Sequence, residues 1–406
     1  MFDVEKIREE FPILSRTVYG RPLVYLDSGA TAQKPRAVIE CVDALHRELN
    51  ANIHRGVHWL SAETTARYEA AREEIRTFIG AAEREEVVFT SGATASINLV
   101  AYSWGERFLR DGDNIVVSEM EHHSNIVPWQ LVAERKGAEI RVLPFDEEGR
   151  LCIELLDSLL DERTRMVAVT QASNTLGTRP DLRTIIDKAH AAGAVVLVDG
   201  CQGAVHGGVD VGALGCDFYA FSGHKLYGPT GIGVLYGRRG LLEDMPPFMG
   251  GGEMVGTVTF ERTTYAELPL KFEAGTPNYI GAIGLGEAVR FVRGFDSAEV
   301  ERHEHELMVH AEKVLTEIDG VRIFGMTEDK CPIISFGAEG VHNYDIGMIL
   351  DKLGIAVRTG HHCAEPVMRH YGVAGMCRAS IGLYNTADEI DALAAGVQRA
   401  VKMLRQ

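Results

Sequence analysis

The chain has 406 residues, of which 46 % are hydrophobic, so it is long enough for two or three domains and a large core. Its net charge of −17 excludes most nucleic-acid and membrane-surface binders, because an acidic surface repels phosphate backbones and anionic lipid. The seven cysteines form no CxxC pair, which argues against a disulfide framework or a zinc ribbon. No apolar run approaches membrane-spanning length, and the charged N-terminal segment lacks a signal core. We therefore expect a cytoplasmic enzyme.

Helix and strand patterns alternate between about residues 60 and 240. Residues 61–80 predict a helix, with Tyr68, Ala71 and Ile75 on one face and Gly80 as its stop. The apolar runs that follow are typical of strands covered on both faces by helices. We expect a mostly parallel seven-stranded sheet in an α/β domain, with strands at 86–90, 114–118, 139–144, 165–170, 194–199, 217–221 and 231–236.

The pattern changes after about residue 260 to strand-like runs separated by helices, which indicates a smaller α+β domain. The final predicted helix begins with Thr386 and Glu389, which can form a capping box. We predict a large domain over 26–263 and a small C-terminal domain over 264–406, with residues 1–25 packing on the small one.

Polar side chains follow the predicted strands at the points where the strands end. Ligands of parallel α/β sheets bind beyond the carboxyl ends of the strands, so these side chains are expected at one site. The set comprises Thr94, His122, Asn174, Asp199, Gln202, Ser222, His224 and Lys225.

This set fits pyridoxal 5′-phosphate (PLP), whose aldehyde needs a lysine amine such as that of Lys225 for a Schiff base. Asp199 could hold the proton on the ring nitrogen. The phosphate needs hydroxyls and a helix N-terminus, which Thr94, Ser222 and His224 with their neighbouring amides could supply.

The ring face needs a flat partner, for which His122 is the candidate, and Asn174 or Gln202 could hydrogen-bond the phenolic oxygen. Each residue alone also has a structural explanation, since a strand-end aspartate is usually a cap and a lone lysine usually lies at the surface. Compatible chemistry at so many strand ends of one sheet makes PLP the favoured reading.

The stretch RTGHHCAEPV, residues 358–367, allows three readings. On an extended segment His361 and Cys363 could share one side for a metal ion, but His362 would point away. Cys363 could instead be an inert core thiol. It could also be a nucleophile, because Arg358 and the histidines would favour its thiolate. These residues alone do not decide between the three.

Together with the PLP set, this stretch resembles the group II (Suf-type) cysteine desulfurases, which belong to the class V aminotransferases of PLP fold type I (aspartate aminotransferase-like). The resemblance runs through nearly the whole chain, and the pair SGHKLYGPTG (222–231) and RTGHHCA (358–364) is the most specific part. Further matching segments are LVYLDSGATAQKP, NIHRGVHWLS, MEHHSNIVPWQ, ASNTLGT, LVDGCQG, FEAGTPN and MCRASIGLYNT.

The resemblance implies that Lys225 binds PLP, His122 stacks on its ring and moves protons, and Cys363 is the sulfur-accepting nucleophile. Arg378 would bind the substrate carboxylate, and Thr276 would reach the phosphate in the other subunit of a homodimer. The other residues implied for cofactor or substrate are Thr94, Asn174, Asp199, Gln202, Ser222, His224, His54, Arg55 and Arg358.

The implied reaction converts L-cysteine to L-alanine and leaves a persulfide on Cys363. The persulfide would pass to a sulfur acceptor protein of the Suf system, for iron–sulfur cluster assembly. The alternatives are a selenocysteine lyase or related PLP lyase that does not need Cys363, a non-catalytic scaffold, and a metal-binding thiol protein.

Three residues depart from the family pattern. Ala93 stands where threonine is common, so one phosphate hydroxyl is absent, and Cys201 replaces the usual alanine before Gln202. Glu365 places a carboxylate near Cys363, where it would disfavour the thiolate.

Overall fold

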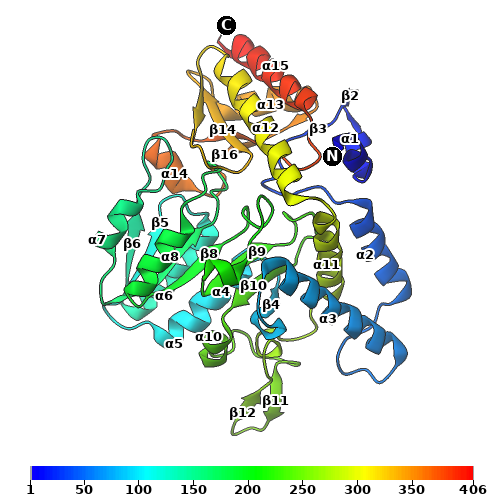
Figure 1. Ribbon diagram of the computed structural model, residues 1–406, viewed down its shortest axis with the longest axis vertical. Helices are drawn as coiled ribbons and strands as arrows, with labels where there is room; N and C mark the ends of the chain where they lie inside the picture. Colours follow the sequence, from blue (N-terminus) through cyan, green and yellow to red (C-terminus); the bar gives the residue numbers. More distant parts are fainter. Residues whose placement is uncertain (1, 406) are drawn as a thin grey trace.

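The computed structural model describes residues 2–405, and its centre is a seven-stranded sheet (Figure 1). The strand order is β4-β10-β9-β8-β7-β5-β6. The strands are β4 (Val87–Thr90), β5 (Asn114–Ser118), β6 (Glu139–Leu143), β7 (Thr164–Thr170), β8 (Val195–Asp199), β9 (Phe218–Ser222) and β10 (Gly233–Gly237).

All seven predicted strands are present, and the sheet is mostly parallel, which confirms the predicted fold class. The exception is β10, which runs antiparallel to both β4 and β9. Strand β6 was expected to be covered on both faces, but it lies at the edge of the sheet and is largely exposed.

Helices cover both faces of the large sheet, and each face has its own apolar core. On one face Ile75, Ile185 and Leu285 belong to α3 (Trp59–Ile79), α8 (Leu182–Ala191) and α11 (Tyr279–Arg293). On the other face Ile97 and Trp129 belong to α4 (Ala93–Val100) and α6 (Val127–Lys136). Gly80 ends α3 in a left-handed conformation, as its position in the pattern predicted.

A second, antiparallel sheet has the order β13 (Val321–Phe324), β14 (Ile333–Ala338), β17 (Met376–Ser380) and β16 (Arg358–Gly360). Three helices share an apolar core with it: α12 (Ser297–Thr316), α13 (Asn343–Lys352) and α15 (Ala387–Leu404). Thr386 and Glu389 form the expected capping box at the start of α15.

The N-terminal segment touches both halves of the molecule. Strand β3 (Val24–Tyr25) pairs with β15 (Ile355–Ala356) beside the antiparallel sheet. Phe11, which follows α1 (Val4–Glu9), packs on Tyr227 after β9 and on Tyr384 after β17. Helix α11 packs on α3 and α2 (Arg36–Glu48), against the large sheet. The division at residues 263 and 264 and the placement of residues 1–25 stay predictions.

The remaining elements are short. A hairpin of β11 (Val255–Val258) and β12 (Thr263–Tyr265) projects away from both sheets (Figure 1). The others are β1 (Thr17–Val18), β2 (Arg21–Pro22), α5 (Glu106–Phe108), α7 (Leu156–Leu159), α9 (Val211–Leu214), α10 (Arg239–Asp244) and α14 (Glu365–His370).

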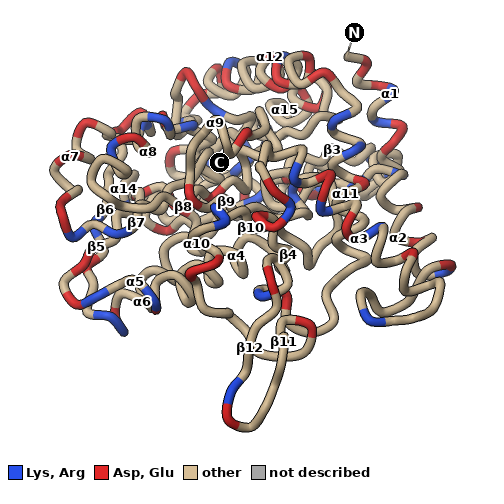
Figure 2. The backbone as a smooth tube through the Cα atoms, turned by 60° about the horizontal axis from the view of Figure 1, so that its bottom comes forward, with Lys and Arg blue, Asp and Glu red and all other residues tan. Residues whose placement is uncertain are grey.

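Acidic and basic residues are interspersed along the chain and are not gathered into one block (Figure 2). Within residues 2–405, no helix combines the length and the apolar character that crossing a bilayer requires.

Candidate active site

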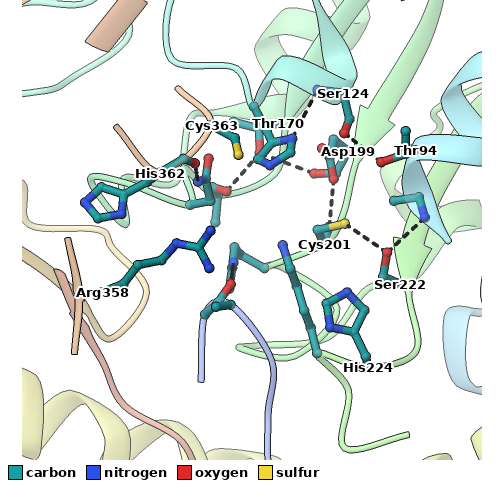
Figure 3. A pocket seen from close by; sticks show the side chains of 18 of the residues that line it. Thr94, Ser124, Thr170, Asp199, Cys201, Ser222, His224, Arg358, His362 and Cys363 are labelled. Carbon is teal, nitrogen blue, oxygen red and sulfur yellow. Dashed lines mark hydrogen bonds between the residues drawn. The ribbon is translucent and has the colours of Figure 1, made fainter. Parts of the chain in front are cut away.

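A cavity of about 180 Å³ lies at the carboxyl ends of β5, β7, β8 and β9, where the polar strand-end residues were expected to meet. Strands β16 and β17 of the antiparallel sheet, together with the turn after β16, close the opposite side of the cavity. Across the cavity, Cys363, His362 and Arg358 face Ser222, Cys201 and His224 (Figure 3). The predicted residues that line it are Thr94, His122, Asn174, Asp199, Gln202, Ser222, His224, Lys225, Arg358, Cys363 and Arg378.

Lys225 lies in the turn after β9. In the described part of the chain its amine has neither a hydrogen-bond nor an ion-pair partner, although it lines the cavity. Asp199 ends β8 with 4 % exposure, and one of its carboxylate oxygens accepts the Cys201 N–H at 2.9 Å. A free amine and a buried carboxylate therefore share the cavity.

His122 has its protonation state set by its surroundings. Its Nδ1 accepts the Ser124 N–H at 3.1 Å, so the neutral ring carries its proton on Nε2. Burial, together with the positive charge of Lys225, lowers the pKa of His122 to about 4. The ring is therefore a neutral, flat group at neutral pH.

The N-terminus of α4 forms the opposite end of the cavity through Ala93 and Thr94. The Ala93 N–H donates to Ser222 Oγ at 2.9 Å, and the Thr94 and Ser124 hydroxyls lie 2.7 Å apart. Gly92 has a φ of 150°, and a Cβ there would lie 3.4 Å from Ser222 Oγ, so glycine keeps this backbone close to the cavity. Hydroxyls and a helix N-terminus suit a phosphate.

Arg378 on β17 connects the two sides of the cavity. Its Nη1 donates to the Asn174 carbonyl at 2.8 Å, and its Nη2 lies 3.2 Å from Asp27 Oδ1. Burial lowers the pKa of Arg378, and its Nε is buried with no hydrogen-bond partner. An unpaired guanidinium donor at a cavity wall is suited to an incoming carboxylate.

Cys363 lies in a turn and not on an extended segment, so the expectation of alternating side chains for residues 361–363 is wrong. His362 and Cys363 both adopt left-handed conformations, with φ of 52° and 56°. The His362 ring points away from Cys363, and its Nε2 lies 3.1 Å from the Met376 carbonyl. Burial and the charge of Arg378 lower the pKa of His362 to about 3.

The half-buried Cys363 lines the cavity, so the core-thiol reading does not fit it. Among residues 2–405, no cluster of three or more histidine, cysteine or acidic side chains has an arrangement suited to a metal ion.

The three departures from the family pattern have different surroundings. Ala93 offers its backbone N–H, and Ser124 contributes a hydroxyl that the sequence reasoning did not assign. Cys201 lies 3.9 Å from Ser222 Oγ, and burial raises its pKa to about 12, so this thiol stays protonated. The Glu365 carboxylate turns away from the cavity and pairs with exposed Arg369 at 3.0 Å.

Three predicted site residues lie outside this cavity. His54 is 3.3 Å from Glu69, and Arg55 is 3.1 Å from Glu253. Thr276 lies in the segment between η6 (Leu270–Phe272) and α11, and its proposed role requires a second copy of the chain. The roles of all three stay predictions.

Several cavity residues were missed by the sequence reasoning. The segment LVYLDSGATAQKP brings in Gly29 and Ala30, and Gln202 donates to the Gly29 carbonyl at 2.9 Å. The signal for Ser124 was its place two residues after His122 in MEHHSN. Thr170 ends the predicted strand 165–170 and had no assigned role, and His362 was considered only as a neighbour of Cys363.

The residues present fit PLP. The free Lys225 amine, the buried Asp199 carboxylate, the neutral His122 ring and the hydroxyl-lined N-terminus of α4 each match one part of the cofactor. Arg378 and Cys363 are additional to what the cofactor needs, and they lie where a substrate would meet it.

Comparison with known proteins agrees with this chemistry. The sequence pattern of the Aminotransferase class-V family matches residues 24–393. A cysteine desulfurase of Pectobacterium carotovorum is 51 % identical over 404 residues, which is 99 % of each chain. The crystal structure of the cysteine desulfurase CsdA from Escherichia coli has a TM-score of 0.93 at 43 % identity and covers 100 % of both chains.

The cysteine desulfurase of Thermococcus onnurineus NA1, solved in its apo form, has a TM-score of 0.93 at 37 % identity over 98 % of both chains. Enzymes of this family depend on PLP, so the cofactor predicted from the strand-end residues is confirmed. This chain belongs to the class V aminotransferase family and, within it, to the cysteine desulfurases.

Proposed function

We propose that this chain removes sulfur from L-cysteine and that Cys363 is the residue that receives it. The observation that carries the proposal is the single cavity in which the free Lys225 amine, the partly unpaired Arg378 guanidinium and the half-buried Cys363 thiol meet. Each of the three has a separate task, in holding the cofactor, binding the substrate and accepting sulfur.

The substrate is bound and oriented by Arg378, whose Nε is free to donate to the cysteine carboxylate. Asn174 and Asp27 fix the guanidinium, so its direction is set before substrate arrives. PLP, when bound, withdraws electrons from the substrate Cα. Lys225 would hold the cofactor and, once displaced by substrate, move the Cα proton.

The other cofactor contacts follow from the positions in the cavity. Asp199 would support the proton on the ring nitrogen, and the neutral His122 ring would cover the ring face. Thr94, Ser222 and His224 would hold the phosphate. Gln202 and Asn174 would contact the remaining polar atoms of the cofactor and substrate.

Sulfur transfer is a displacement by the Cys363 thiolate on the substrate sulfur. A sulfur–sulfur bond forms as the carbon–sulfur bond breaks, and the bonding electron pair stays with the carbon, which takes up protons to become alanine. The oxidised sulfur remains on Cys363 as a persulfide, so the half-reaction needs no external oxidant. A thiol must then remove the persulfide sulfur.

The subtype and partners rest on sequence resemblance and surface features. RTGHHCA on a short turn is typical of the group II enzymes, whose acceptor protein must bring its own thiol into the cavity. We therefore infer a Suf-type acceptor and a role in iron–sulfur cluster assembly. Thr276 outside the cavity and the exposed Phe260 on the β11–β12 hairpin are compatible with a homodimer that shares its sites.

The proposal is tested by a single turnover with L-cysteine, without reductant, followed by mass spectrometry of the cysteine-containing peptides. We expect one extra sulfur on the Cys363 peptide, none on the Cys201 peptide, and one alanine for each persulfide. Cys152→Ser, which changes a partly exposed thiol outside the cavity, is the matched control. Alanine formation without sulfur on Cys363 would contradict the proposal and favour a lyase that does not need this thiol.

A further inference from the structure

His123 joins the turn that carries Cys363 to the strand-end side of the cavity through two hydrogen bonds. The His123 N–H donates to the Cys363 carbonyl at 2.7 Å. The Glu365 N–H donates to the His123 ring at Nε2, at 3.1 Å. One residue thus binds the backbone at Cys363 itself and two residues after it.

The segment that His123 holds, residues 361–365, has a backbone that needs support. His362 and Cys363 are consecutive non-glycine residues with positive φ, a conformation that persists only when the surroundings impose it. Within the described chain, three hydrogen bonds connect the backbone of this segment to residues that are distant in the sequence. Asn174 makes one, through the His362 carbonyl, and His123 makes the other two.

The contact with Glu365 also determines which ring nitrogen of His123 carries the proton. An Nε2 that accepts a hydrogen bond carries no proton, so the neutral ring is protonated on Nδ1. His123 lies between His122 and Ser124, which both line the cavity, although it does not line the cavity itself. A shift of this turn would therefore move Cys363 together with the His122 ring.

We propose that His123 is a positioning residue, which sets the place of Cys363 Sγ relative to the substrate sulfur by holding residues 361–365 in their left-handed turn. It acts through the turn and does not touch substrate or cofactor. This inference deepens the proposed desulfurase function and rests on it.

The kinetic test compares His123→Leu, which removes the acceptor at similar volume, with His123→Gln, which supplies a carbonyl oxygen near the position of Nε2. For His123→Leu we expect kcat for alanine formation to fall by about 10- to 100-fold while KM changes little, because a displacement of about 1 Å costs this much. His123→Gln should recover most of the loss. His310→Leu is the matched control, since His310 is paired with Asp391 on the surface, away from the cavity.

The structural test is hydrogen–deuterium exchange of the intact protein, which does not depend on turnover. Peptides spanning residues 361–366 should exchange faster in His123→Leu, with other segments of the chain unchanged. Glu365→Gln keeps the backbone N–H and should leave this exchange as in the unchanged protein. If His123→Leu does not fold, His123→Asn, whose shorter amide cannot reach the Glu365 N–H, takes its place.

The proposal is overturned if His123→Leu retains kcat, if His123→Gln is as impaired as His123→Leu, or if exchange at 361–366 is unchanged. It is also overturned if Glu365→Gln reproduces the effect, because the contact would then run through the carboxylate. If the unchanged protein makes no alanine from L-cysteine, the desulfurase proposal fails, and the exchange result still decides whether His123 holds the turn.

Discussion

The two sides of the cavity are built in different ways. The cofactor side follows the ends of straight, buried, parallel strands, so Asp199 and Lys225 are placed by the sheet itself. The nucleophile side is a turn after the short edge strand β16, with His362 and Cys363 in left-handed conformations that cost about 1–2 kcal/mol each. A ligand-holding surface can thus rest on regular structure, while the proposed nucleophile depends on a turn held by contacts from the opposite side.

Lys225→Ala should impair the cofactor side without changing the turn that carries Cys363, and it should reduce alanine formation more than Arg378→Lys does. The amine would both hold PLP and move the Cα proton, so alanine formation should fall by about 100-fold to 10,000-fold. The cofactor absorption should also weaken, as measured after gel filtration. Alkylation of Cys363 by iodoacetamide should proceed as in the unchanged protein, because the turn does not depend on Lys225. Equal activity in Lys225→Ala and in the surface control Lys188→Ala would contradict this assignment.

Arg378→Lys tests the residue that connects the two sides. The charge-assisted bonds to the substrate carboxylate are worth about 1.5–3 kcal/mol, so KM for L-cysteine should rise by about 10- to 100-fold. The cofactor absorption should be retained, since Arg378 is additional to the residues that fit the cofactor. The control is Arg369→Lys, which makes the same substitution at an exposed arginine. An unchanged KM would show that another group binds the carboxylate.

Lowering the pH should destabilise the folded protein at both sides of the cavity, because each side contains buried neutral histidines. Burial lowers the pKa of His122 to about 4 and that of His362 to about 3, whereas both ionise near 6.5 in the unfolded chain. The unfolded state therefore binds more protons below pH 6.5, and stability falls as the pH decreases from 6.5 towards 4.

The two histidines should together lower the free energy of unfolding by about 3 kcal/mol between pH 6.5 and 5, measured by urea titration. Lowered carboxyl pKa values, such as that of Glu69 at about 2, act below this window. Burial raises the pKa of Glu121 to about 8, so its protonation in the folded state offsets about 2 kcal/mol of the histidine loss within the window. His362→Asn should make the free energy of unfolding less dependent on pH, because it removes the contribution of the histidine on the nucleophile side. A urea midpoint that stays constant from pH 7 to 5 would contradict the account.

The cofactor side could be predicted from the sequence because its strands are unbroken apolar runs, and the residue after each run then falls at one sheet edge. The antiparallel direction of β10 could not be predicted, since its apolar run looks like the others. The turn at Cys363 was expected to be extended, and its shape depends on contacts with Asn174 and His123, residues far away in the sequence. Long-range backbone contacts of this kind leave no local pattern.

The resemblance to a known family supplied what local patterns could not. Cys363 could be read as a metal ligand, a core thiol or a nucleophile from its neighbours alone. Its place in the same cavity as Lys225 favours the nucleophile interpretation, which stays a prediction. Ser124 shows the opposite case, because a hydroxyl two residues from His122 was within reach of sequence reasoning and was overlooked.

The most direct test of the separate roles of the two sides uses Cys363→Ala, purified with PLP and supplied with L-cysteine. Alanine release and the absorption of the bound cofactor are followed in the same sample. We predict that the cofactor absorption is retained and still changes when L-cysteine is added, while alanine formation is lost. Alanine formation at the rate of the unchanged protein would contradict the account, because the sulfur would then leave without Cys363.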